Sequence, residues 1–176
     1  MSVATLGNAI VRARSRKGLG QRGLASIINY SDKTVSAIET GYRSLPHGAA
    51  SRLVAALDDP ELITALQAEA TGGIASPILD GESVDLHRSS VRDKVIEECS
   101  EVIKALAEAR AMVNCKSGKD LNDEGKRQIA EVIHQGFEAI TALWNLLAVL
   151  CSTYGISFTA AFKAHVKELK AKGLMK

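Results

Sequence analysis

The sequence predicts an almost entirely helical protein. Hydrophobic residues make up 46% of the 176 residues and aromatic residues only 4%. Alanine, leucine, isoleucine and valine supply most of the apolar side chains. Only three prolines are present, and no run alternates apolar and polar residues as a half-buried strand would. This composition and periodicity favour helices over strands.

The amino-terminal part carries the start and stop signals of short helices. Asn29 is suited to a left-handed turn, Ser31 is a favourable N-cap, and Gly41 can end a helix. Pro46 and Pro60 can each stand in the first turn of a further helix. We expect helices at residues 3–17, 21–29, 31–40, 46–57 and 59–70.

The second and third of these helices follow the pattern of a helix-turn-helix. The pattern reads Gly18-Leu19-Gly20-Gln21, Leu24-Ala25, Ser31-Asp32-Lys33-Thr34-Val35 and Ile38-Glu39-x-Gly41-x-Arg43. This is the order of parts in a helix-turn-helix: a support helix, a tight turn, and a second helix that can enter a DNA groove. Over about the first 57 residues, the pattern resembles the λ-repressor/Cro (XRE) family. The resemblance implies a sequence-specific DNA-binding regulator, most often a repressor of a phage or other mobile element.

The outward positions of the third helix are the candidate base-reading residues. Lys33 can donate to guanine, and Thr34 offers a methyl group to thymine. Asp32 can accept from cytosine, or it can serve only to cap the helix. The candidate set is Asp32, Lys33, Thr34, Ser36 and Ala37. The alternative is a helical hairpin whose charged outer face binds nothing.

A second set is expected to contact the DNA backbone. The resemblance implies that Gln21, which opens the second helix, holds a phosphate. Arg43 follows the third helix closely and is expected to bind a second phosphate. The other candidates are Arg14, Arg16, Lys17 and Arg22.

The charge distribution supports a division into two parts. The formal net charge is +2, but residues 1–56 hold eight basic and two acidic residues. The rest of the chain holds 14 basic and 18 acidic residues. A basic first part and an acidic second part are typical of a nucleic-acid-binding module joined to a segment with another role. Glycines and Pro77 mark residues 72–85 as the linker, which predicts domains at 1–71 and 86–176.

The second domain is expected to consist of long helices. Ser90-x-x-Asp93 should open the first, and a polar loop at 114–123 should precede the second, which runs to about Tyr154. A basic helix should then end the chain. The apolar seam expected along the first long helix is Val95, Cys99, Val102, Leu106, Ala109 and Val113.

The second long helix is expected to form an oligomer interface. Residues 139–162 contain no charged side chain, and their apolar residues leave almost no polar face. The length would permit a membrane span, but Thr141, Asn145 and an amphipathic lead-in favour burial in a dimer or tetramer. The expected interface residues are Phe137, Ile140, Leu143, Trp144, Leu147 and Leu150. A dimer predicts an inverted-repeat operator in double-stranded DNA.

Two other functions remain open from the sequence. In one, the chain is an antitoxin whose carboxyl-terminal helices hold a toxin. In the other, the run Glu97-Glu98-Cys99-Ser100-Glu101 resembles MazG-type nucleotide pyrophosphohydrolases, which implies magnesium at Glu98 and Glu101. The second acidic pair of that family, Glu-x-x-Asp, is incomplete, because the nearest matches are Glu131-x-x-His134 and Glu138-x-x-Thr141. We therefore expect no enzyme activity, no metal site and no cofactor.

The cysteines and the amino terminus favour a cytoplasmic protein. Cys99, Cys115 and Cys151 are widely spaced without a CxxC pattern, which predicts reduced thiols and no zinc site. Asn8 and the arginines after it interrupt any signal peptide. Some family members have a self-cleaving, β-rich domain cut at a dipeptide such as Ala-Gly, which this sequence lacks. We expect a separate antirepressor or partner protein to release the regulator.

Overall fold

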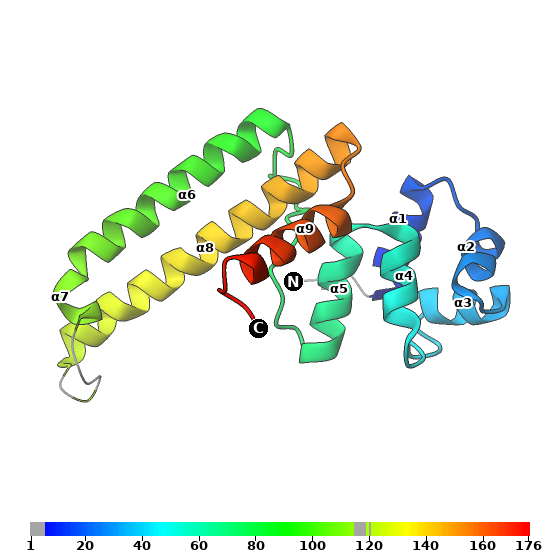
Figure 1. Cartoon of the computed structure of the whole chain (residues 1–176), viewed down its shortest axis with the longest axis horizontal. Coiled ribbons are helices and arrows are strands. Elements are labelled where there is room, and N and C mark those ends of the chain that lie inside the picture. The colour runs from blue at the N-terminus through cyan, green and yellow to red at the C-terminus, as the bar shows by residue number, and fades with distance from the viewer. Residues whose placement is uncertain (1–5, 115–118, 120) are drawn as a thin grey trace. The chain divides into compact units, whose positions relative to one another are not determined.

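The computed structural model describes residues 6–114, 119 and 121–176 (Figure 1). Within those residues every regular element is an α-helix except for short turns, and no strand occurs. The predicted all-α class is therefore confirmed. The start of the first expected helix, at Val3, lies outside the described residues, as does Cys115.

The helices follow the predicted order with a few shifted boundaries. Helix α4 begins at Ala49, because Gly48 adopts a left-handed conformation with a φ of 78° and breaks the helix expected from Pro46. Helix α6 begins at Arg88, because the His87 side chain caps it, two residues before the expected start at Ser90. The helices are α1 Leu6–Arg16, α2 Gln21–Ile28, α3 Asp32–Glu39, α4 Ala49–Leu57, α5 Pro60–Thr71, α6 Arg88–Glu108, α7 Arg110–Val113, α8 Asp123–Tyr154 and α9 Phe158–Ala171.

The chain divides into two compact units, and the division differs from the expected one. The first unit combines Met1–Ala75 with Cys151–Lys176, and the second is Ser76–Leu150. Helix α9 therefore groups with the amino-terminal helices and not with α6 and α8. The first unit holds 13 basic and 7 acidic side chains, and the second holds 9 and 13. The net charges of +6 and −4 follow this division.

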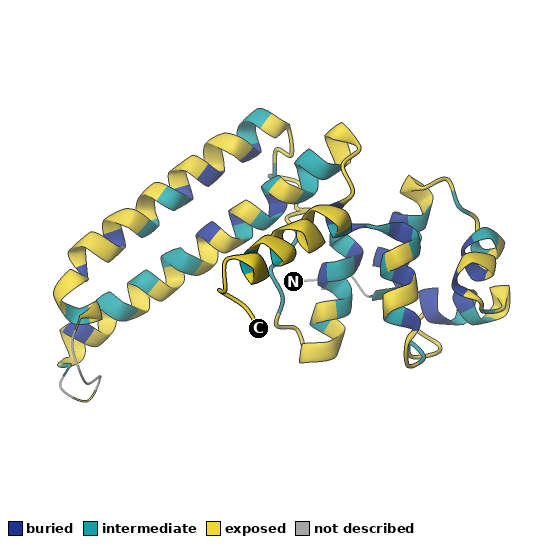
Figure 2. Cartoon of the chain, viewed as in Figure 1, coloured by how far each residue is buried: buried dark blue, intermediate teal, exposed yellow. Residues whose placement is uncertain are grey.

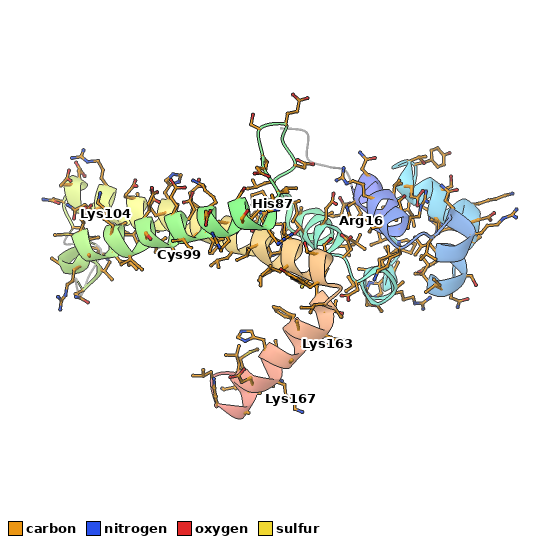
Figure 3. The ribbon with its side chains drawn as sticks, turned by 90° about the horizontal axis from the view of Figure 1, so that it is seen from above. Arg16, His87, Cys99, Lys104, Lys163 and Lys167 are labelled. Atoms are coloured by element: carbon orange, nitrogen blue, oxygen red, sulfur yellow. The ribbon has the colours of Figure 1, made fainter. Side chains whose placement is uncertain are left out.

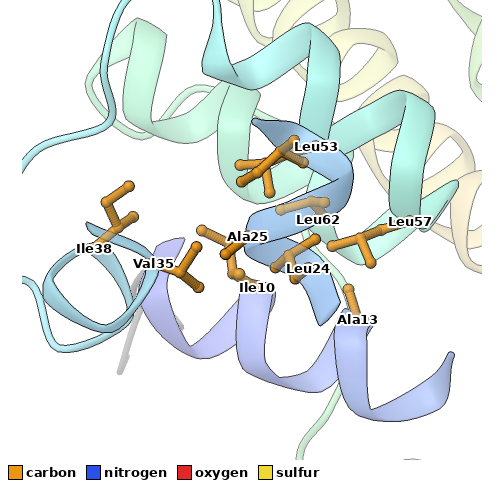
Figure 4. Packing of buried hydrophobic residues seen from close by; sticks show 10 residues of the cluster. Ile10, Ala13, Leu24, Ala25, Val35, Ile38, Leu53, Leu57 and Leu62 are labelled. Atoms are coloured by element: carbon orange, nitrogen blue, oxygen red, sulfur yellow. The ribbon is translucent and has the colours of Figure 1, made fainter. Parts of the chain in front are cut away.

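Helices α1 to α5 enclose a core of large aliphatic side chains (Figure 4). Leu24, Leu53 and Leu62 are each at most 1% exposed. Helices α1 and α3 approach closely, because a Cβ atom at Gly7 would lie 2.1 Å from the carbonyl oxygen of Glu39. Only glycine fits there, so this contact sets how α3 lies on the core.

Helix α9 is attached to the first unit at its amino-terminal end. The backbone N–H of Thr159 donates to a carboxylate oxygen of Asp58 at 2.8 Å, and Phe158 is buried. Asp58 ends α4 in a left-handed conformation. Burial would raise the pKa of Asp58, but hydrogen bonds from Ser157 and Thr159 and the charge of Lys17 lower it. The ionised carboxylate therefore anchors α9.

In the second unit, α6 and α8 run alongside each other in opposite directions (Figure 1). The side chain of Asn145 accepts from the N–H of Leu79 and donates to the carbonyl oxygen of Pro77, both at 2.9 Å. These bonds hold the segment before α6 against α8. The seam expected on α6 is only partly correct. Val95 and Ala109 are buried, but Leu106 and Val113 are exposed, and the buried positions are Val91, Val95, Glu98, Ala105 and Ala109.

Candidate nucleic-acid interface

The turn between α2 and α3 has the predicted geometry. Asn29 has a φ of 59° and a ψ of 50°, and the N–H of Tyr30 donates to the carbonyl oxygen of Ala25 at 2.9 Å. Ser31 then caps α3, since its hydroxyl oxygen accepts from the N–H of Thr34 at 3.1 Å. The turn and the cap together fix where α3 begins.

Helix α3 has a buried face and a face turned to solvent. Val35 and Ile38 are 2% and 6% exposed and belong to the core. A shallow hollow, open to solvent, lies on the other side and includes Asp32 and Lys33. Thr34 does not line it, and its hydroxyl hydrogen-bonds to Ser31. The hollow is lined by Gln21, Asp32, Lys33, Ser36, Ala37, Thr40 and Tyr42.

A buried glutamate connects α3 to two other helices. The side chain of Glu39 is 4% exposed and accepts from Arg14 Nε at 2.6 Å. The same carboxylate accepts from Arg14 Nη2 at 3.1 Å and from Gln21 Nε2 at 2.7 Å. Hydrogen bonding to Glu39 raises the pKa of Arg14 despite its partial burial. The network fixes α1, α2 and α3 relative to one another.

Sequence reasoning missed Glu39, although a signal for it existed. An acidic residue in the last turn of a helix interacts unfavourably with the helix dipole. Glu39 is the last residue of α3, so its presence there needs a compensating cation. Arg14 supplies it through two hydrogen bonds.

The structure separates the expected backbone-binding residues into two groups. Arg14 is bound to Glu39, and Arg16 donates to Asp59 at 2.8 Å and to Glu61 at 2.7 Å. Burial lowers the pKa of Arg16, but Glu61 and Asp59 raise it by more. These two guanidinium groups hold α1 to α3 and α5, which corrects the expectation that they bind phosphate. Gln21 belongs to both groups, because it lines the hollow while its amide donates to Glu39 at 2.7 Å. The remaining cations of the set, Lys17, Arg22 and Arg43, are exposed.

Asp32 has partners of its own within the protein. Its carboxylate accepts from the N–H of Lys33 at 2.9 Å and lies 3.6 Å from Arg22 Nε. The Arg22 side chain is 92% exposed. Asp32 therefore accepts from an N–H group in the first turn of α3, whose N-cap is Ser31, and lies near Arg22.

Much of the surface of α6 and α8 is exposed (Figure 2), and it includes large apolar side chains. Among the expected interface residues, Phe137, Ile140, Leu143 and Leu147 are 41–65% exposed. Trp144 and Leu150 are half-buried. Helix α6 adds Ile96, Ile103 and Leu106, which the sequence analysis did not place at an interface. Among the described residues, α8 is the one helix that is both long enough and apolar enough to cross a membrane. Length and composition alone are weak evidence for a membrane span.

Glu98 and Glu101, one turn apart on α6, differ in their exposure to solvent. Glu98 is 5% exposed and lies 2.7 Å from Lys94 Nζ, whereas Glu101 is exposed. Glu98 is therefore already paired with a cation within the protein. No group of three His, Cys, Asp or Glu residues in the described ranges could hold a metal ion. Cys99, on α6 in Figure 3, and Cys151 are free thiols.

Comparisons with known proteins identify no relative. No protein-family model matches the chain, and neither a curated protein nor a solved structure was found to be similar. The XRE resemblance of the amino-terminal part therefore stays a prediction.

Proposed function

We propose that the chain is a sequence-specific DNA-binding transcriptional regulator of the XRE type, most simply a cytoplasmic repressor of a phage or mobile element. The observation that carries this proposal is the arrangement of α3. Ser31 and Asn29 fix its start, Val35 and Ile38 attach it to the core, and Lys33 lies on its open side. A helix held in this way can enter the major groove without rearranging the core.

The residues around the hollow suit base recognition. Lys33 is exposed and can donate to the O6 and N7 atoms of guanine. Ala37 offers a methyl group to thymine, and Ser36 can donate or accept. Because Asp32 already has two partners, its role is to stabilise the first turn of α3 and to position Arg22. Thr34 is left as a secondary contact.

The charge of the first unit supports binding to phosphate. Its net charge is +6, and the cations that border α3 are Arg22 and Arg43. We expect Arg43 and Gln21 to bind the backbone and Lys33 to read a base. Phosphate contacts release counterions, so affinity should fall steeply as the salt concentration rises.

The second unit should join two copies of the chain. Eight large apolar side chains, each 41–68% exposed, form stripes with helical spacing on α6 and α8. At about 100 Å² each, they would bury roughly 800 Å² per copy, which is typical of a stable interface. They are Ile96, Ile103, Leu106, Ile133, Phe137, Ile140, Leu143 and Leu147.

Pairing explains how a small module achieves specificity. Two linked modules bind neighbouring half-sites, and the second contact becomes intramolecular. The operator should then be an inverted repeat, with half-sites roughly 10 base pairs or a multiple of that apart. A self-associating chain sediments as a dimer or tetramer without any other protein. An antitoxin that uses the apolar side chains of α6 and α8 only to bind a toxin would sediment as a monomer in the absence of that toxin.

The position of Asn145 supports association over insertion into a membrane. Its side chain holds the backbone of Pro77 and Leu79 against the middle part of α8. If α8 spanned a membrane, this non-helical segment at Pro77 and Leu79 would lie in the hydrocarbon layer, where irregular backbone exposed to lipid does not occur.

Selection of bound sequences from random duplex DNA tests the proposal. The wild-type protein should enrich one motif, and Lys33→Ala should relax the preference at one position of each half-site. Gln21→Ala should weaken binding to all sequences alike. Lys104→Ala, an exposed lysine on α6 in Figure 3, is the matched control and should change neither. If no motif is enriched, or if Lys33→Ala and Gln21→Ala have the same sequence-independent effect, the proposal is wrong.

A further inference from the structure

Tyr42 is the most exposed large apolar side chain in the part of the chain that the structure describes. It is 91% exposed, whereas Tyr30 is half-buried with Arg52 over its ring at 5.6 Å. An aromatic ring left in water forgoes the free energy of burial. The ring also lies at a particular place, because Tyr42 lines the hollow beside Lys33 and Ala37.

The turn that carries Tyr42 is fixed to the end of α3. Gly41 has a φ of 73°, and its N–H donates to the carbonyl oxygen of Ile38 at 3.0 Å. The N–H of Arg43 donates to the carbonyl oxygen of Ala37, also at 3.0 Å. The backbone on both sides of Tyr42 is therefore hydrogen-bonded to α3. A contact made from such a turn costs little ordering entropy on binding.

We infer that Tyr42 is a DNA-contacting residue that positions α3 in the groove. Its ring packs on a deoxyribose at the groove edge, and its hydroxyl donates a hydrogen bond to a backbone phosphate. This inference rests on the proposed function and assigns a residue that the sequence analysis did not select. Tyrosine suits the place, because an apolar ring and a polar tip match a sugar and a phosphate.

The uncharged side chain gives the inference a distinct signature. A cation that binds phosphate releases a counterion, and its removal lowers the salt dependence of binding by about one unit of slope. Tyr42 carries no charge, so its removal should weaken binding and leave the slope unchanged. Arg43, the next residue, should show the opposite signature and is a matched comparison within the same turn.

The test is to measure affinity for the selected operator at several salt concentrations. Tyr42→Phe should weaken binding about 5-fold and Tyr42→Ala about 30-fold, with the wild-type salt slope. Arg43→Ala should lower the slope. Tyr154→Phe, which removes another exposed hydroxyl, is the control and should bind as the wild type does. The thermal midpoint of Tyr42→Ala should match that of the wild type, since the ring packs against little of the protein.

The outcomes separate this inference from the proposed function. If the wild-type protein enriches an operator but Tyr42→Ala binds it equally well, the inference alone is wrong. A reduced salt slope for Tyr42→Ala would also contradict it, since it would show a loss of cationic contacts. If the wild-type protein enriches no operator, the inference and the proposed function both fail.

Discussion

The two units of the chain differ in the size of the side chains that form their interiors. In the first unit, Leu24, Leu53 and Leu62 are at most 1% exposed. In the second, small residues such as Ala139 and Ala142 are buried, while Ile103 and Phe137 are 68% and 65% exposed. A unit of the first kind has a core of its own. A unit of the second kind gains most of its burial only when another molecule covers it.

Each unit has a buried glutamate, and the two glutamates differ in how fully their carboxylates are hydrogen-bonded. Glu39 accepts three hydrogen bonds from Arg14 and Gln21. Glu98 pairs with Lys94 through one oxygen, while its buried Oε2 has no hydrogen-bond partner among the described residues. An unpartnered buried oxygen costs about 1–3 kcal/mol. The carboxylate of Glu98 is therefore less well satisfied than that of Glu39.

The largest expected effect comes from the core of the first unit. Leu53→Ala should lower the free energy of unfolding by about 3 kcal/mol, because it leaves a cavity among buried leucines. Urea denaturation followed by circular dichroism measures this change. The matched variant Ile103→Ala should barely affect the stability of the monomer and should instead weaken self-association. An equal loss of monomer stability in both variants would abolish the contrast between the units.

The buried ion pair should have the next largest effect. Glu39→Gln leaves the guanidinium of Arg14 without its carboxylate and should cost about 2 kcal/mol of stability. It should also weaken DNA binding at all sequences, because α3 is no longer fixed to α1 and α2. Glu101→Gln, an exposed glutamate on α6, is the control. If Glu39→Gln matches this control in denaturation and in DNA binding, the network does not position α3.

The attachment of α9 should have a smaller effect that depends on pH. The folded-state pKa of Asp58 lies below its ordinary value of 3.8, so its stabilising effect is present above about pH 4 and is lost as the pH falls through the folded-state pKa. Hydrogen exchange of the α9 amides should show protection at pH 7 that decreases near pH 3. Asp58→Gly can still adopt the left-handed backbone conformation but removes the carboxylate that accepts from Thr159. The α9 amides of this variant should therefore be less protected than those of the wild type at pH 7.

Asp58→Asn separates the charge from the hydrogen bond in that experiment. Asparagine tolerates the left-handed conformation and can still accept from Thr159, but it does not titrate in this range. Its α9 protection should therefore change less between pH 7 and pH 3. A loss of protection on acidification that is as large as in the wild type would exclude Asp58 as the titrating group.

The features that the sequence predicted well are those set by neighbouring residues. The left-handed turn at Asn29, the cap at Ser31 and the start of α5 at Pro60 each depend on a few adjacent positions. The grouping of α9 was missed, because it depends on a hydrogen bond between Asp58 and Thr159, which are 101 residues apart.

Within the candidate site, the missed features are those that depend on several helices. A list of basic residues does not show which of them are paired within the protein. The sequence therefore predicts a DNA contact for Arg14, whereas the structure pairs Arg14 with Glu39. The buried face of α6 differs from the predicted apolar seam for a similar reason. Alanine and leucine both fit a helical seam, and only the packing with α8 puts Ala105 inside and Leu106 outside.

One selection experiment tests the two units together. The wild-type protein should enrich an inverted repeat from random duplex DNA. The double variant Phe137→Ser, Ile140→Ser, with the DNA-contacting residues intact, should sediment as a monomer and enrich only a single half-site, bound more weakly. Enrichment of the same inverted repeat by a variant that is shown to be monomeric would contradict the account. So would a wild-type protein that enriches no sequence at all.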